Sequence, residues 1–230
     1  MYKKIFAIAV PVLFLLSVLL IAQAARPDDK PPYIEKIIFI HYEKKAKPGG
    51  GGTTSSCSYK LLSGGIRWKT FPVPYEVNPE GSGVAAENVT NAAFLSSEAW
   101  DARVTPDLFD APALTAAQAA DLDGKNTVVW SSLDPGIIAV TSLWYNTVTK
   151  TIVEFDITLS TNYGWVTDGN ADKMDVQNIA THEIGHGAGL GDLYATKDAE
   201  QTMYGYSSLE ETKKQTLECG DIKGVIKLYG

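Results

Sequence analysis

The sequence predicts an α+β domain built on a twisted mixed β-sheet. Most of the elements that we expect between residues 73 and 159 are strands. One segment with helical periodicity, residues 84–102, lies before the middle of the chain, and two further helical segments come late. Strands and helices that are segregated along a chain, and do not alternate strictly, are typical of the α+β class.

The first elements to place are two strands and a helix. The apolar, β-branched run at residues 33–42 (YIEKIIFIHY) is a strand candidate. It either belongs to a short pro-segment or docks on the main domain. Residues 73–79 (VPYEVNP) are the first strand expected within the main domain, and the helix at residues 84–102 follows.

Three more strands and a turn follow toward the middle of the chain. Residues 126–130 and 139–145 are expected to be strands, and residues 146–150 resemble a hairpin turn. Residues 151–159 (TIVEFDITL) alternate between apolar and polar side chains, so one face of this strand should be buried. Residues 218–229 are expected to form the last short helix.

Composition and the N-terminal residues limit the class of protein. The chain has 230 residues, of which 45% are hydrophobic and 20% charged, enough for one sizeable core. Its formal charge of −7 argues against a nucleic-acid partner. Residues 1–24 have the pattern of a secretory signal, with Lys3 and Lys4, an apolar run, and a cleavage site after Ala24. An uncleaved membrane anchor is the alternative for this segment.

The chain is therefore expected to have three segments, of which the signal segment, residues 1–24, is the first. Residues 25–56 combine the strand candidate with a linker that contains four consecutive glycines, and residues 57–230 form the main domain.

The most informative motif is residues 182–192, which read H-E-x-x-H-x-x-G-x-x-D. A helix over residues 176–188, with Asp175 as its N-cap, places His182 and His186 on one face, about 6 Å apart along the axis. Both imidazoles can then reach one zinc ion. A glycine at position 189 tolerates positive φ, so the chain can bend there and bring Asp192 back as a third ligand.

This ligand set predicts a hydrolytic zinc site. Three protein ligands leave zinc an open position for water, whose pKa zinc can lower toward roughly 7. Glu183 would take the proton and later deliver it to the leaving amine. An ordinary helix with two core histidines is the alternative, but two of only three histidines lie in this motif. We expect the third, His41, to be an incidental surface or strand histidine.

The motif resembles that of the metzincin metallopeptidases, with the third-ligand Asp of the snapalysin-type branch. The sequence is similar to the matrixins over residues 57–230. Besides the histidine motif, the segments that resemble matrixin sequences are residues 123–130, 139–145, 154–159, 203–204 and 220–230. The resemblance implies a secreted zinc endopeptidase, with Met203 in a Met-turn beneath the metal and a C-terminal helix. It also implies that residues 151–159 form an edge strand above the cleft and pair with extended substrate.

Two departures from the matrixin pattern concern the site. Asp192 stands where matrixins have His, and Gly205 and Tyr206 follow Met203-Tyr204 where matrixins typically have Pro. Side-chain specificity should therefore not be transferred from that family. Tyr204 and Tyr206 are candidates for the substrate pocket or for transition-state hydrogen bonds, and packing is the alternative role for both.

The only two cysteines, Cys57 and Cys219, bracket nearly the whole main domain. Export would permit a disulfide between them, which we expect. The alternative is a matrixin-type switch in which Cys57 occupies the zinc and silences the enzyme.

The cofactor and partners expected are one zinc ion and a protein or peptide substrate, with no nucleic acid, in a monomer. Membrane contact is expected only if the N-terminal segment stays uncleaved. Asp121, Asp123 and Asn126 have a spacing that could hold Ca²⁺, and a solvated acidic loop is the alternative. A catalytically silent, zinc-stabilised extracellular binding protein is the competing function, but such a site does not need Glu183 as a base.

Overall fold

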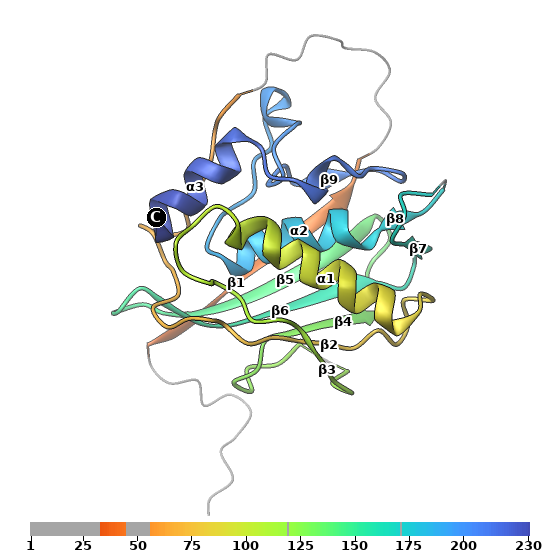
Figure 1. Ribbon diagram of the computed structural model, residues 1–230, viewed down its shortest axis with the longest axis horizontal. Helices are drawn as coiled ribbons and strands as arrows, with labels where there is room; N and C mark the ends of the chain where they lie inside the picture. Colours follow the sequence, from red (N-terminus) through yellow and green to blue (C-terminus); the bar gives the residue numbers. More distant parts are fainter. Residues whose placement is uncertain (1–32, 45–55, 119, 171) are drawn as a thin grey trace, which may run out of the picture. The chain divides into compact units, whose positions relative to one another are not determined.

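The computed structural model describes residues 33–44, 56–118, 120–170 and 172–230 (Figure 1). The expected signal segment and most of the glycine-rich linker lie outside these ranges. Within them, no helix has the length and apolar character needed to cross a membrane. Residues 32–230 form one compact unit, to which the following description is confined.

A seven-stranded mixed sheet is the centre of this unit, and its order is β3-β2-β4-β6-β5-β1-β9. Pairings among β2, β3, β4 and β6 are parallel, whereas β5 runs antiparallel to both β6 and β1. A short parallel ribbon, β7–β8, stands apart from this sheet. The strand bounds are β1 Ile34–Glu43, β2 Glu76–Val77, β3 Ala113–Leu114, β4 Thr127–Ser131, β5 Ile137–Asn146, β6 Thr151–Ser160, β7 Trp165–Val166, β8 Met174–Asp175 and β9 Tyr206–Ser207.

Two helices, α1 (Ala86–Asp101) and α2 (Val176–Gly187), lie side by side across one face of the sheet (Figure 1). The third, α3 (Cys219–Tyr229), is the last element, and short 3₁₀ turns occupy Thr196–Asp198 and Lys213–Gln215. The α+β fold class predicted from the sequence is confirmed, with the metzincin-like combination of a mixed sheet, an α2 helix that carries the histidine motif, and a C-terminal helix.

Side chains between the sheet and α2 form the core that fixes the position of α2. Leu143 of β5, Phe155 and Ile157 of β6, and Ile184 of α2 are all fully buried. Each buried side chain of this size contributes about 1.5–3 kcal/mol relative to exposure. The indole of Trp100 in α1 donates a 2.9 Å hydrogen bond to the Thr181 carbonyl, which fixes α1 against α2.

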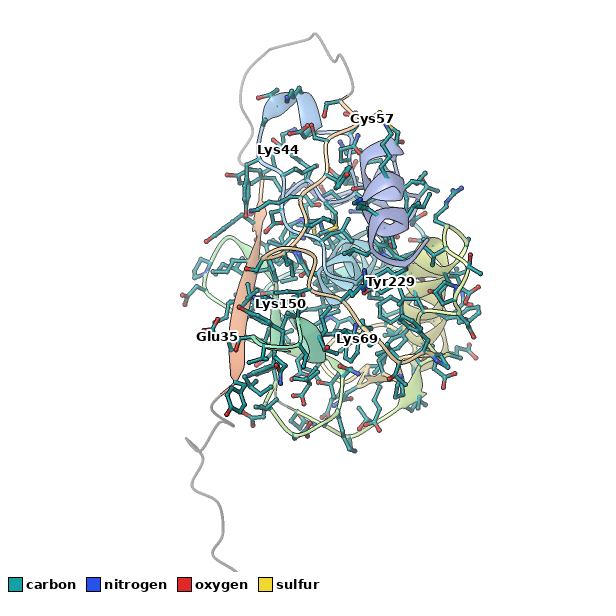
Figure 2. All side chains as sticks on the ribbon, turned by 90° about the vertical axis from the view of Figure 1, so that its left-hand side faces the viewer. Glu35, Lys44, Cys57, Lys69, Lys150 and Tyr229 are labelled. Atoms are coloured by element: carbon teal, nitrogen blue, oxygen red, sulfur yellow. A yellow bond between two sulfur atoms is a disulfide. The ribbon has the colours of Figure 1, made fainter. Side chains whose placement is uncertain are left out.

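The position of β6 corrects one prediction. We expected residues 151–159 to be an edge strand, but β6 lies between β4 and β5 and pairs with both. Alternation in a sequence reports which face of a strand is buried and does not report its neighbours. The strand beside β5 is instead β1, so residues 33–42 dock on the main sheet (Figures 1 and 2).

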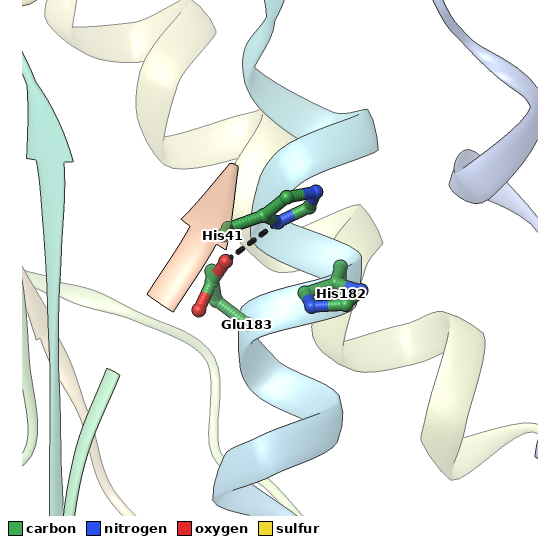
Figure 3. Close-up of side chains that lie close together, drawn as sticks. All are labelled: His41, His182 and Glu183. Atoms are coloured by element: carbon green, nitrogen blue, oxygen red, sulfur yellow. Dashed lines mark hydrogen bonds and ion pairs between the residues drawn. The ribbon is translucent and has the colours of Figure 1, made fainter. Parts of the chain in front are cut away.

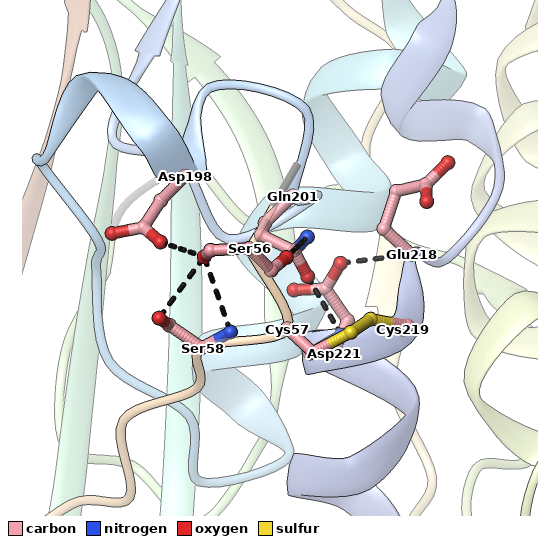
Figure 4. The surroundings of a disulfide bond; sticks show 9 residues. Ser56, Cys57, Ser58, Asp198, Gln201, Glu218, Cys219 and Asp221 are labelled. Atoms are coloured by element: carbon pink, nitrogen blue, oxygen red, sulfur yellow. Dashed lines mark hydrogen bonds between the residues drawn. A yellow bond between two sulfur atoms is a disulfide. The ribbon is translucent and has the colours of Figure 1, made fainter. Parts of the chain in front are cut away.

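The expected disulfide is present and joins Cys57 to Cys219, across a sequence separation of 162 residues (Figure 4). It fastens the start of the main domain to the first residue of α3. Cys57 is therefore not available as a zinc-binding thiolate, and the switch alternative is wrong. Beside the disulfide, Asp221 of α3 accepts hydrogen bonds from the backbone N–H of Thr202, at 2.7 Å, and of Met203, at 3.1 Å. Helix α3 thereby fixes the backbone of the loop that contains Met203.

Candidate metal and catalytic site

Helix α2 brings His182 and His186 together on its buried face. Its first turn is capped by Asp175, whose side chain accepts from the Asn178 N–H at 2.8 Å, as predicted. His182 Nδ1 lies 2.7 Å from the Thr202 carbonyl, and His186 Nδ1 lies 2.9 Å from the Leu190 carbonyl. A carbonyl only accepts, so each Nδ1 carries a proton, and in the neutral ring the lone pair with which imidazole binds a metal is then on Nε2.

A bend after α2 brings Asp192 opposite these two nitrogens. Gly189 has φ of +101°, and a Cβ there would collide with the Ile66 carbonyl oxygen, so both the conformation and the space require glycine. Beyond the bend, Asp192 Oδ1 lies 3.2 Å from His182 Nε2 and 3.4 Å from His186 Nε2.

The three atoms fit a zinc ion. Zinc bonds of 2.0–2.1 Å in a tetrahedral arrangement place ligand atoms roughly 3.3 Å apart, which the Asp192 distances match. His182 Nε2 and Asp192 Oδ1 are also buried without any hydrogen-bond partner among the described residues. Buried polar atoms without partners are costly in a folded protein unless an ion or water satisfies them.

Charge at the site supports the same fit. Burial lowers the pKa of His182 to about 4, so this imidazole is neutral at pH 7. Burial alone would raise the pKa of Asp192, but the two histidines outweigh it and hold the pKa far below its ordinary value. Burial would likewise lower the pKa of His186, yet the Asp192 carboxylate raises it. Positive charge nearby stabilises the buried Asp192 carboxylate, and a bound metal cation would supply such a charge.

Glu183, the residue after the first histidine, extends toward β5 and β1 and lies close to His182 (Figure 3). The Thr141 hydroxyl of β5 donates to its Oε2 at 2.6 Å, and His41 Nδ1 lies 2.8 Å from its Oε1. Burial raises the pKa of Glu183 to about 7, close to the range in which a carboxyl group can both take and release a proton.

His41 corrects a second prediction, because it is not incidental. His41 is 1% exposed, and the centroid of its ring lies 4.0 Å from the centroid of the His182 ring. The side chains of His41, His182 and Glu183 are close enough to share a metal ion. Burial keeps the pKa of His41 well below 6.5, so the ring is neutral. Its Nε2 lies 3.2 Å from the Lys214 ammonium, which can only donate, so Nδ1 carries the proton and donates to Glu183.

Lys214 was not singled out by the sequence among the lysines of the chain. It is fully buried, and burial lowers its pKa to about 8. Its ammonium donates to the Tyr204 carbonyl at 2.6 Å, the Tyr206 carbonyl at 2.9 Å and the Ser207 hydroxyl at 2.8 Å. The loop that follows Met203 is therefore held by one cation.

Met203 is buried beneath α2, where its sulfur fills the space left by the absent side chain of Gly185.

Tyr204 and Tyr206 line a cavity of about 710 Å³ together with Tyr42 at the end of β1. Within the described residues, neither of the Tyr204 and Tyr206 hydroxyls hydrogen-bonds to the three candidate ligands. A different tyrosine does, because the Tyr194 hydroxyl donates to Asp192 Oδ2 at 3.0 Å.

The candidate calcium residues do not converge on a site. Asn126 uses its amide to donate to the Pro74 carbonyl and to accept from the Phe155 N–H, both at 2.8 Å. Among the described residues, two groups lie close enough to hold a metal, and neither includes Asp121, Asp123 or Asn126.

Comparison with known proteins agrees with this geometry. Residues 146–230 match the sequence profile of the family described as Matrixin. A stretch of 72 residues is 39% identical to Metalloendoproteinase 1-MMP of Arabidopsis thaliana, covering 29% of this chain and 18% of that protein. The chain thus spans less than a fifth of the length of this relative. The region that contains α2, Asp192, Met203 and α3 is similar to a matrixin peptidase domain, and the likeness supports a metzincin metalloprotease.

Proposed function

We propose that this protein is a secreted zinc endopeptidase in which His182, His186 and Asp192 hold the metal and Glu183 is the general base. The observation that carries the proposal is the set of three buried ligand atoms, all within 4.8 Å of one another, in which the Asp192 oxygen lies at zinc-like distances from the two histidine nitrogens. The matrixin match over residues 146–230 supports the reaction class. The disulfide is compatible with an oxidising, extracellular environment.

Zinc, when bound, would polarise the scissile carbonyl and activate water for attack. Glu183 accepts the proton of that water as the new carbon–oxygen bond forms. It then delivers the proton to the leaving amine nitrogen as the peptide bond breaks.

Asp192 distinguishes this site from one with three histidines, as in the snapalysin-type branch. Two neutral imidazoles and one carboxylate leave a site with zinc bound at a net charge of about +1, compared with +2 for three imidazoles. We expect the activated water to be less acidic here. A pH–rate profile whose acidic limb lies clearly below that of a three-histidine enzyme would contradict this expectation.

The test is hydrolysis of casein and of a quenched peptide library, with chelator and Glu183→Gln as controls. Because β1 covers Glu183, the assay includes a form with a specific protease site introduced between Lys44 and Ser56 and cut there. We expect hydrolysis that is lost with either control. Hydrolysis that survives both would refute the mechanism. Zinc bound stoichiometrically without hydrolysis in either form would favour the silent binding protein.

A further inference from the structure

We propose that β1 is an internal occupant of the peptide-binding groove, and that it keeps the site inactive until this strand leaves. The proposal rests on the proposed function, whose site it regulates. The occupant is a segment of this chain, residues 34–43, which lies between β5 and β9.

The backbone of β1 uses the groups that an extended peptide would need. Its pairing with β5 is antiparallel and runs from Ile34 opposite Asn146 to Tyr42 opposite Ile137. On its other edge, Tyr42 and Glu43 pair in parallel with β9. A peptide that adds to a sheet edge requires unpaired N–H and C=O groups along that edge. While β1 is in place, a second strand cannot add to β5 beside the metal site.

Two side chains of β1 cover the two functional parts of the site. The ring of Phe39 stacks on His186, with centroids 3.9 Å apart and planes at 9°. His41, two residues further on the same face, donates to the Glu183 carboxylate. Ile38, the residue before Phe39, points away from the site and is 57% exposed. Alternate residues of one strand therefore cover a metal ligand and the base.

Burial of the site shows how complete this cover is. His182 and Glu183 are 0% exposed, His186 is 1% exposed and Asp192 is 6% exposed. A scissile carbonyl must come within about 3 Å of the base or of its water. Both Glu183 oxygens are also occupied, one by Thr141 and the other by His41. The occupied groove is incompatible with catalysis, and departure of β1 would free the Oε1 atom.

The connection between β1 and the main domain provides a means of release. Residues 45–55 join the two and include the glycines at positions 49–52. Attachment within one chain gives the strand an effective concentration on the order of millimolar, whereas a cut strand must bind as a separate molecule. Hydrolysis of one peptide bond between Lys44 and Ser56 therefore converts intramolecular occupancy into binding that dilution reverses.

The experiment compares the full chain before and after that cut, using the introduced protease site. We expect hydrolysis of the quenched peptide to rise on the order of 100-fold after cutting and dilution. A synthetic peptide of residues 33–44 should restore inhibition. In the uncut chain, Phe39→Ala and His41→Ala should raise activity, and Ile38→Thr, a matched change on the outer face, should not. Thermal melting checks that each variant is folded.

A second readout does not depend on activity. A fluorescent 33–44 peptide should bind the cut Glu183→Gln chain, and a peptide carrying both the Phe39→Ala and His41→Ala changes should bind at least tenfold more weakly. Equal hydrolysis before and after the cut, or absence of peptide binding, overturns the proposal. The first of these results leaves the proposed function intact. No hydrolysis in any form, together with peptide binding, refutes the proposed function and retains β1 as a releasable occupant of the groove.

Discussion

Replacement of Tyr194 by Phe should weaken zinc binding without altering the ligands. The change removes only the hydroxyl group that donates to Asp192 Oδ2 at 3.0 Å and keeps the ring that packs against Gly205. Asp192 would keep its position opposite the two histidines but lose the bond that orients its carboxylate. Outer partners of this kind typically contribute 10- to 100-fold to metal affinity.

The environment of Tyr194 decides where in that range the effect falls. Tyr194 is 49% exposed, so water can replace part of the lost hydrogen bond to Asp192. We therefore expect the lower end, a zinc dissociation constant about tenfold higher, or about 1.4 kcal/mol. The comparable change Tyr206→Phe removes a hydroxyl without a hydrogen bond in the described residues and should leave the constant within about twofold.

Competition with a chromogenic chelator, followed by titration at fixed pH, measures both constants. Glu183→Gln in the background of each variant prevents self-digestion during the titration. If Tyr194→Phe and Tyr206→Phe bind zinc equally, then the hydroxyl of Tyr194 does not orient the ligand. If both lose affinity to the same degree, aromatic packing around the loop is responsible instead.

Three further predictions concern stability. Gly185→Ala should cost about 1–3 kcal/mol, because its Cβ would overlap Met203, and urea unfolding of the metal-free protein measures this cost. Replacing Cys57 and Cys219 by Ser should lower stability by up to about 5 kcal/mol, given the long loop that they close; an unchanged melting temperature would contradict this. Burial raises the pKa of Glu154 from 4.5 to about 7, so the folded state binds more protons and stability should fall as pH rises between these values. Glu154→Gln should flatten that decline by about 1–3 kcal/mol, as urea midpoints at pH 5 and pH 8 would show.

Features set by local geometry could be predicted from the sequence. The i, i+4 spacing of His182 and His186 fixes their common face once the segment is helical. The Gly189 bend needs only positive φ, and Asp192 follows three residues later. The cap at Asp175 is equally local, so the structure reproduces its predicted role.

Features set by long-range pairing could not be predicted. His41 and Glu183 are separated by 142 residues, and their contact depends on which strand lies beside β5 and in which register. A shift of one residue would turn His41 outward, and nothing in the alternation of residues 33–42 specifies the partner. Lys214 was missed for a related reason, because its burial depends on carbonyl groups that only the folded loop brings together.

The bonds of Lys214 have a consequence for any peptide that replaces β1. When His41 departs, the ammonium keeps its acceptors at Tyr204, Tyr206 and Ser207. The loop of residues 204–207, on the side of the groove opposite β5, can therefore keep its conformation when β1 has left the groove. Association then requires little ordering of the enzyme, and most of the entropy lost is that of the incoming peptide. For a series of peptides, flexibility of the ligand should consequently govern affinity more than adaptation of the groove.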